Sequence, residues 1–163
     1  MKFGWINVFG AGIVVLLLIP NIVYAVQNPG EENRCTNRFM NMIEQIGRYA
    51  CIILMWLPLL VWKFGFAGVA QMLLYTAGNG VLIAAYWFVF AEYLKEKNTG
   101  RALILAVLPA CIFFLSGLLL RHWLLAGFAL LFAAGHVYVT FQNTGKDPGM
   151  AGREQEVGPE REN

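Results

Sequence analysis

Long apolar runs separated by short polar stretches form the dominant pattern along this chain. A helix needs about 20 mostly apolar residues to cross the hydrocarbon core of a bilayer, because each residue adds about 1.5 Å along its axis. Runs of about this length predict helices at residues 4–26, 46–62, 66–93, 101–120 and 123–141. The pattern therefore predicts an all-α integral membrane protein, built as a five-helix transmembrane bundle.

The polar stretches predict how these spans are connected. Residues 27–45 form the longest polar loop, and from Phe39 the apolar residues recur as in an amphipathic helix at the cytoplasmic face of the membrane. Residues 144–163 are rich in glycine, proline and charge, which predicts a disordered cytoplasmic tail. The connection at residues 63–65 is so short that the second and third spans are expected to be antiparallel neighbours. Residues 1–143 are thus expected to form one transmembrane domain.

The first apolar run has a second interpretation, as a secretory signal peptide. Lys2 would then lie in its charged start, and Val23 and Ala25 would mark a small-residue cleavage site. The charge bias favours a retained helix, since only Lys2 precedes the run whereas three basic residues follow it: Arg34, Arg38 and Arg48.

The basic residues also predict the orientation of the bundle. With five spans, Lys2, Lys63 and Arg121 lie on one side of the membrane, and the other nine of the 12 basic residues lie on the opposite side. Basic residues accumulate on the cytoplasmic side of membrane proteins. The amino terminus is therefore expected outside and the carboxyl terminus in the cytoplasm, in a multi-pass protein of the cell membrane. The bacterial cytoplasmic membrane is the expected location.

Composition narrows the range of partners. The chain is 58% hydrophobic and 13% charged, which lies outside the range of soluble domains. Its net charge of +2 and the lack of a Lys or Arg run argue against binding to nucleic acid. The expected partner is the lipid bilayer, with a second copy of the chain or another membrane subunit as further partners. Cys35, Cys51 and Cys111 lack metal-ligand spacing, so no metal, cofactor or disulfide framework is expected.

The run at residues 66–93 carries polar side chains along one face. At helical spacing Gln71, Tyr75, Asn79 and Tyr86 share this face, and most of the other residues are apolar. A polar group without a partner in hydrocarbon costs several kcal/mol. These side chains are therefore expected to face other helices or a wet cavity.

The run at residues 123–141 has a matching face of small and polar residues. They recur at intervals of four and three: His122, Ala126, Ala129, Ala133, His136, Thr140 and Asn143. Small residues permit close helix approach in lipid, so this face is expected to point inward. Counted from the outer ends of their helices, Asn79 and His136 lie at a similar depth. A polar interior between the third and fifth helices is thus expected, with a ligand-binding set of Gln71, Tyr75, Asn79, Tyr86, His136 and Thr140.

His136 is the titratable residue of greatest interest, because an imidazole inside a membrane can carry a proton, bind a metal or bond to a neighbouring helix. No acid or second histidine is expected at its depth, which favours a packing role. Glu44 and Arg48 are expected to pair across one helical turn at the surface. Glu92 is expected either to contact Arg48 or to relay protons. The sequence has no catalytic motif, and no catalytic residue is assigned.

Three classes of function fit these patterns. The first is a protein that binds or transports a small solute or ion through its polar interior. The second is a non-catalytic membrane subunit or regulator, in which the polar residues only hold helices together. The third is a lipid-modifying membrane enzyme with His136 as base. A cavity lined by these residues would favour the first class, a filled interior the second, and a titratable partner for His136 the third.

Overall fold

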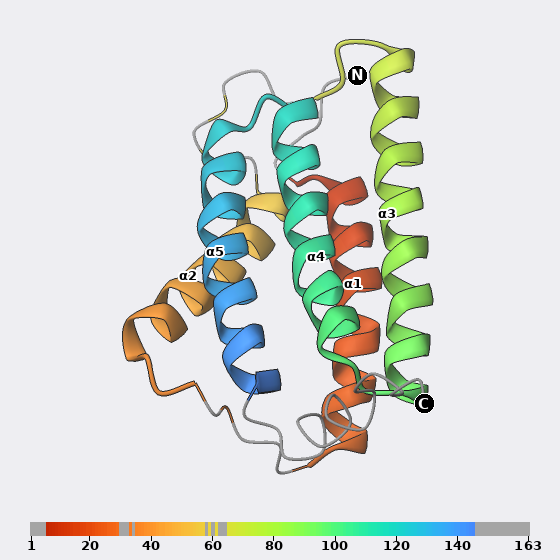
Figure 1. Cartoon of the computed structure of the whole chain (residues 1–163). Coiled ribbons are helices and arrows are strands. Elements are labelled where there is room, and N and C mark those ends of the chain that lie inside the picture. Colours follow the sequence, from red (N-terminus) through yellow and green to blue (C-terminus); the bar gives the residue numbers. More distant parts are fainter. Residues whose placement is uncertain are drawn as a thin grey trace, which may run out of the picture.

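The computed structural model describes residues 6–29, 33, 35–57, 59, 61 and 65–145. Within these residues the chain forms five α-helices (Figure 1): α1 Val8–Gln27, α2 Arg38–Trp56, α3 Val69–Lys95, α4 Thr99–Leu119 and α5 Trp123–Gly145. The predicted all-α class is confirmed. Residues 146–163, which make up most of the predicted tail, lie outside the described residues.

Four of the five described helices are long and apolar enough to cross a membrane, namely α1, α3, α4 and α5. The second helix does not reach the same hydropathy, because it carries three charged residues, Arg38, Glu44 and Arg48, among its apolar ones. The chain is thus a polytopic membrane protein with four candidate spans in its described part.

The boundary of α2 differs from the prediction. The amphipathic segment expected before residue 46 and the second predicted span form one continuous helix. Asn37 sets its start, because its side-chain oxygen accepts hydrogen bonds from the backbone N–H groups of Phe39 and Met40 at 3.1 and 3.2 Å. The helix ends at Trp56, and several residues of the predicted span beyond it, including Pro58 and Trp62, lie outside the described residues.

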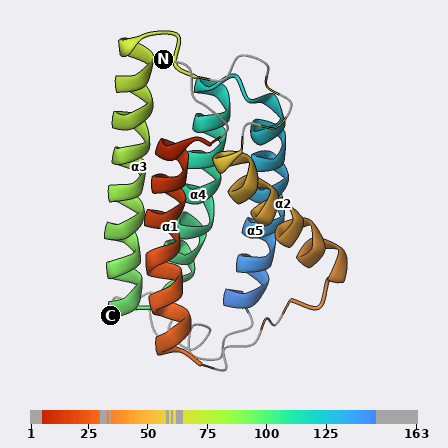
Figure 2. The same ribbon diagram turned by 180° about the vertical axis from the view of Figure 1, so that it is seen from behind.

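The four candidate spans lie side by side, and α2 crosses them obliquely (Figures 1 and 2). In this arrangement α4 lies between α3 and α5, while α2 packs mainly against α5. One predicted neighbour relation is therefore wrong, because the second and third helices do not pack along each other. The third and fifth helices lie on either side of α4. The length of a connection and the periodicity of a helix limit which helices can be neighbours, but they do not determine which ones pack together.

The contact between α1 and α3 is held by a proline-linked hydrogen bond. Pro20 has no N–H, so it leaves the carbonyl of Leu16 without its helical donor. The indole N–H of Trp87 in α3 donates to this carbonyl at 3.0 Å. Further along, the ring centroids of Tyr24 and Phe90 lie 6.1 Å apart. From Leu16 with Trp87 to Tyr24 with Phe90, the residue numbers of the contacting pairs increase along both helices, so α1 and α3 run in the same direction.

Glycine residues bring α2 and α5 into backbone contact. A Cβ atom on Gly135 would lie 2.7 Å from the backbone nitrogen of Glu44, and one on Gly47 would lie 2.7 Å from the Cα atom of Phe132. Such distances are too short for any real Cβ atom, so only glycine fits at either position. The expected inward face of the last helix is in part buried, with Ala129 1% exposed, whereas Leu131 on another face is 50% exposed.

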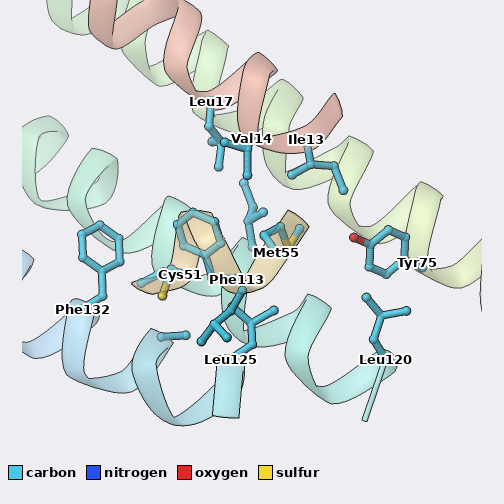
Figure 3. Close-up of a cluster of buried hydrophobic side chains, with 14 of the residues drawn as sticks. Ile13, Val14, Leu17, Cys51, Met55, Tyr75, Phe113, Leu120, Leu125 and Phe132 are labelled. Carbon is cyan, nitrogen blue, oxygen red and sulfur yellow. The ribbon is translucent and has the colours of Figure 1, made fainter. Parts of the chain in front are cut away.

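The hydrophobic core joins all five helices. Figure 3 shows Val14 of α1, Met55 of α2, Tyr75 of α3, Phe113 of α4 and Leu125 of α5 within one cluster. All five are almost fully buried. This filled core occupies the middle of the bundle and leaves space toward one of its ends.

Candidate functional site

A partly open cavity of about 350 Å³ lies toward the end of the bundle where α1, α3 and α5 finish and α4 begins. All five helices contribute to its wall. The apolar part of the wall includes Val14, Leu17, Leu105, Pro109, Phe113 and Phe132. The polar part includes Asn21, Arg48, Tyr86, His136, Thr140 and Asn143. The cavity therefore offers an apolar and a polar surface to the same occupant.

Glu44, Arg48 and His136 form a charged group at the edge of this cavity. The carboxylate oxygen Oε1 of Glu44 lies 3.1 Å from Nδ1 of His136, and it also pairs with Nη2 of Arg48. The side chain of Glu44 is only 6% exposed, whereas those of His136 and Arg48 are 23% and 45% exposed. The acid is thus buried behind two residues that line the cavity. Close backbone contact at Gly135 places the acid within reach of the imidazole.

The charge state of Glu44 follows from these contacts. Burial disfavours the ionised form of the Glu44 carboxyl group, but the positive charge of Arg48 and the contact with His136 favour it. An ionised carboxylate can only accept hydrogen bonds, so Nδ1 of His136 carries the donated hydrogen. The other ring nitrogen, Nε2, then bears the lone pair in the neutral imidazole. The imidazole also stacks on Phe132, with ring centroids 4.8 Å apart, which fixes its plane.

Asn21 and Tyr86 form a second polar group of the cavity wall. The side-chain amide of Asn21 donates to the hydroxyl oxygen of Tyr86 at 2.9 Å and to the Leu17 carbonyl at 2.8 Å. Tyr86 is 2% exposed, and both residues line the cavity. Thr140 of α5 also lines it. The cavity thus has hydrogen-bonding groups without a formal charge on α1, α3 and α5 and the charged Arg48 on α2.

Ion pairs surround the nearby connection between α3 and α4. Glu92 pairs with Lys95 at 2.6 Å, and Glu96 pairs with Arg101 at 2.8 Å. The predicted contact between Glu92 and Arg48 is wrong, because Arg48 pairs with Glu44 within its own helix. Glu92 is an interfacial residue with a lysine partner one turn away, and it lies outside the cavity wall.

Tyr86, His136 and Thr140 are the predicted ligand-binding residues that the structure brings together, since all three line the cavity. The other three lie elsewhere. Gln71 donates to the carbonyl of Leu119 and so ties the start of α3 to the end of α4. Gln71 therefore does not line the cavity described above.

Asn79 and Tyr75 belong to a packed polar cluster in the other half of the bundle. The amide of Asn79 donates to the carbonyl of Tyr75 at 2.9 Å, and its oxygen accepts from the hydroxyl of Ser116 at 3.1 Å. Tyr75 is fully buried beside Asn7 and Ser116. Asn79 therefore does not meet His136, because α4 supplies its partner instead.

Three residues of the site were missed from the sequence: Asn21, Glu44 and Arg48. The pairing of Glu44 with Arg48 was predicted and is confirmed, but the pair was assigned to the surface. Glu44 is instead 4% exposed. The available signal was an opposite-charge pair on a helix whose other face is apolar. Such a pair inside a membrane protein points inward, because hydrocarbon does not solvate it.

Among the described residues, no group of three His, Cys, Asp or Glu side chains could hold a metal ion. Comparison with protein-family models, with curated proteins and with solved structures gives no match. Fold and site together therefore define a class, a polytopic membrane protein with a cavity that is part apolar and part polar.

Proposed function

We propose that this protein binds a small amphipathic molecule in the cavity between α1, α4 and α5. The observation that carries the proposal is the buried Glu44, paired with His136 and Arg48 at the edge of a cavity whose wall is part apolar and part polar. Burying a carboxylate is costly unless it is paired. A bundle that needed only close packing would be served by apolar residues here, as it is in the core shown in Figure 3.

The two halves of the polar interior support different roles. The side-chain amide of Asn79 bonds to the backbone carbonyl of Tyr75 and to the hydroxyl of Ser116, and both side chains are buried, which supports the predicted role of holding helices together. Around His136 the polar groups line a space of about 350 Å³. Pockets for small ligands span about 300–1,000 Å³, so this space lies at the lower end of that range. Binding is the part of the predicted binding or transport function that the cavity supports.

The membrane topology that goes with this proposal has five crossings. Since α1 and α3 run in the same direction, the chain between them has to return across the bundle. The end of α2 lies beside the start of α1, where the N–H of Asn7 donates to the carbonyl of Trp56 at 2.8 Å. The exposed face of α2 is apolar at intervals of three and four, which suits contact with lipid: Phe39, Met42, Ile46, Tyr49 and Ile53. The basic residues then give an external amino terminus and a cytoplasmic cavity.

Cysteine labelling tests this topology in intact cells. The native cysteines are replaced by serine, and single cysteines are placed at the exposed positions Ile6, Arg121 and Gly145. An impermeant maleimide should label positions 6 and 121 in intact cells and position 145 only after permeabilisation. Protection of position 6 together with labelling of position 121 would refute the five-crossing arrangement, because an even number of crossings places positions 6 and 145 on the same side.

Photo-labelling tests the binding site. The purified protein in phosphatidylcholine nanodiscs is irradiated with two 12-carbon probes that carry a diazirine, one a carboxylic acid and one an alcohol. We expect saturable labelling of cavity residues by at least one probe. Ala106→Phe fills the cavity wall and should abolish this labelling, whereas Ala84→Phe on the exposed face of α3 should not. Unsaturable labelling, or labelling unchanged by Ala106→Phe, would contradict the proposed site.

A lipid-modifying enzyme is the second candidate, and the hydrogen bond between Glu44 and His136 favours it. A carboxylate on Nδ1 orients an imidazole so that Nε2 can act as a base. The test is incubation of wild type and His136→Gln with phosphatidylglycerol nanodiscs, followed by mass spectrometry of the lipids. A product formed only by wild type would favour the enzyme over the binding protein. Identical lipid profiles would remove this candidate.

A further inference from the structure

We propose that the occupant of the cavity is an anionic single-chain amphiphile, whose carboxylate or phosphate group is held by Arg48. The inference deepens the proposed binding role and rests on it. It starts from the sign of the charges that face the cavity. Among the described residues that line it, Arg48 carries a positive charge and none is an aspartate or a glutamate. Glu44 lies behind Arg48 and His136, with its Oε1 atom already bonded to both.

Arg48 has donors left for a ligand. A guanidinium carries five N–H donors in a planar fork, and the contact with Glu44 uses Nη2. Its side chain is 45% exposed and makes no other hydrogen bond or ion pair within the described part of the chain. Arginine with a planar fork matches the oxygen atoms of carboxylates and phosphates. The buried Glu44 holds the guanidinium of Arg48 at the cavity edge, so this group stays in place when a ligand leaves.

Neutral groups complete the polar end of the site. The hydroxyl oxygen of Tyr86 accepts from Asn21, which leaves its hydrogen available for a ligand oxygen. Lys97 adds positive charge near the rim, where its ammonium lies 5.4 Å above the ring of Tyr24. The described acids at this rim have basic partners of their own, Glu92 with Lys95 and Glu96 with Arg101.

The rest of the wall fits an alkyl chain. Leucine, valine, proline and phenylalanine side chains from α1, α4 and α5 form it, and burial of each methylene there contributes about 0.8 kcal/mol. A volume near the lower limit for ligand pockets accommodates one chain and excludes a two-chain lipid. Burial of the ligand's alkyl chain gives affinity, and Arg48 gives a preference for an acid over an alcohol of the same chain length.

The two photo-probes test the ligand class directly. At equal concentration the carboxylic acid should label cavity residues of wild type at least about tenfold more than the alcohol, since a hydrogen bond to a charged group exceeds 1.4 kcal/mol. Arg48→Gln should reduce the acid to the level of the alcohol, and Arg48→Lys should retain part of the preference. Arg38→Gln, which removes an exposed charge at the start of the same helix, is the matched control and should change nothing.

Unlabelled competitors separate the sources of the anion. Dodecyl phosphate should displace the acid probe, and inorganic phosphate at the same concentration should not. Displacement by inorganic phosphate alone would overturn the amphiphile and indicate a site for a free anion. Equal labelling by acid and alcohol in wild type would overturn the anionic class while leaving the proposed binding role intact. Absence of saturable labelling by both probes would instead refute the binding role itself.

Discussion

Substitution of Gly135 is the most direct test of how α2 and α5 meet. In Gly135→Ala the new methyl carbon would lie 2.7 Å from the nitrogen and 2.8 Å from the Cα atom of Glu44. Both are backbone atoms of a helix, so α2 has to move as a unit. Overpacking of this kind costs about 1–3 kcal/mol. Alanine also favours the helix over glycine by about 0.5–1 kcal/mol, which offsets part of the loss.

Gly127→Ala is the matched control, because Gly127 lies in the same helix and an added Cβ atom there would meet nothing within 4 Å. It has the same gain in helix propensity and no clash. We expect the free energy of unfolding of Gly135→Ala to lie about 1–3 kcal/mol below that of Gly127→Ala. The measurement is unfolding by sodium dodecyl sulfate in bicelles, followed by tryptophan fluorescence. Equal unfolding of the two variants would refute the close approach, and with it the placement of Glu44 beside the cavity.

Two further predictions concern stability under the same assay. Ser116→Ala leaves the buried side-chain oxygen of Asn79 without its donor and should lower the free energy of unfolding by about 1 kcal/mol. Adding Asn79→Leu to this variant should restore part of the lost stability. A double variant no more stable than Ser116→Ala would contradict the pairing. Ala133 packs against the core, so Ala133→Leu should lower the free energy of unfolding by about 1–3 kcal/mol. Leu131→Ala on the exposed face should lower it far less. Equal losses would show that the inward face of α5 is misassigned.

Helix positions and inward faces followed from the sequence alone. Apolar runs in lipid have to form helices, because each backbone group needs an internal partner. This constraint is local, so it could be applied without any tertiary contact. Four of the five predicted runs became helices long and apolar enough to span, and Leu131 is exposed while Ala129 is buried. The same reasoning placed Tyr86, His136 and Thr140 on inward faces, and these residues line the cavity.

Only the tertiary structure decided which inward faces meet. Glu44 and His136 are 92 residues apart in sequence, and their contact depends on backbone approach at Gly135. Periodicity gives the direction of a face around its own helix, but α4 rather than α5 became the partner of Asn79. The burial of Glu44 depends on the oblique path of α2 across α5 (Figure 2), which places Glu44 against Gly135. The arrangement of the helices, which no single run encodes, therefore decided which polar residues hold the bundle together and which line the cavity.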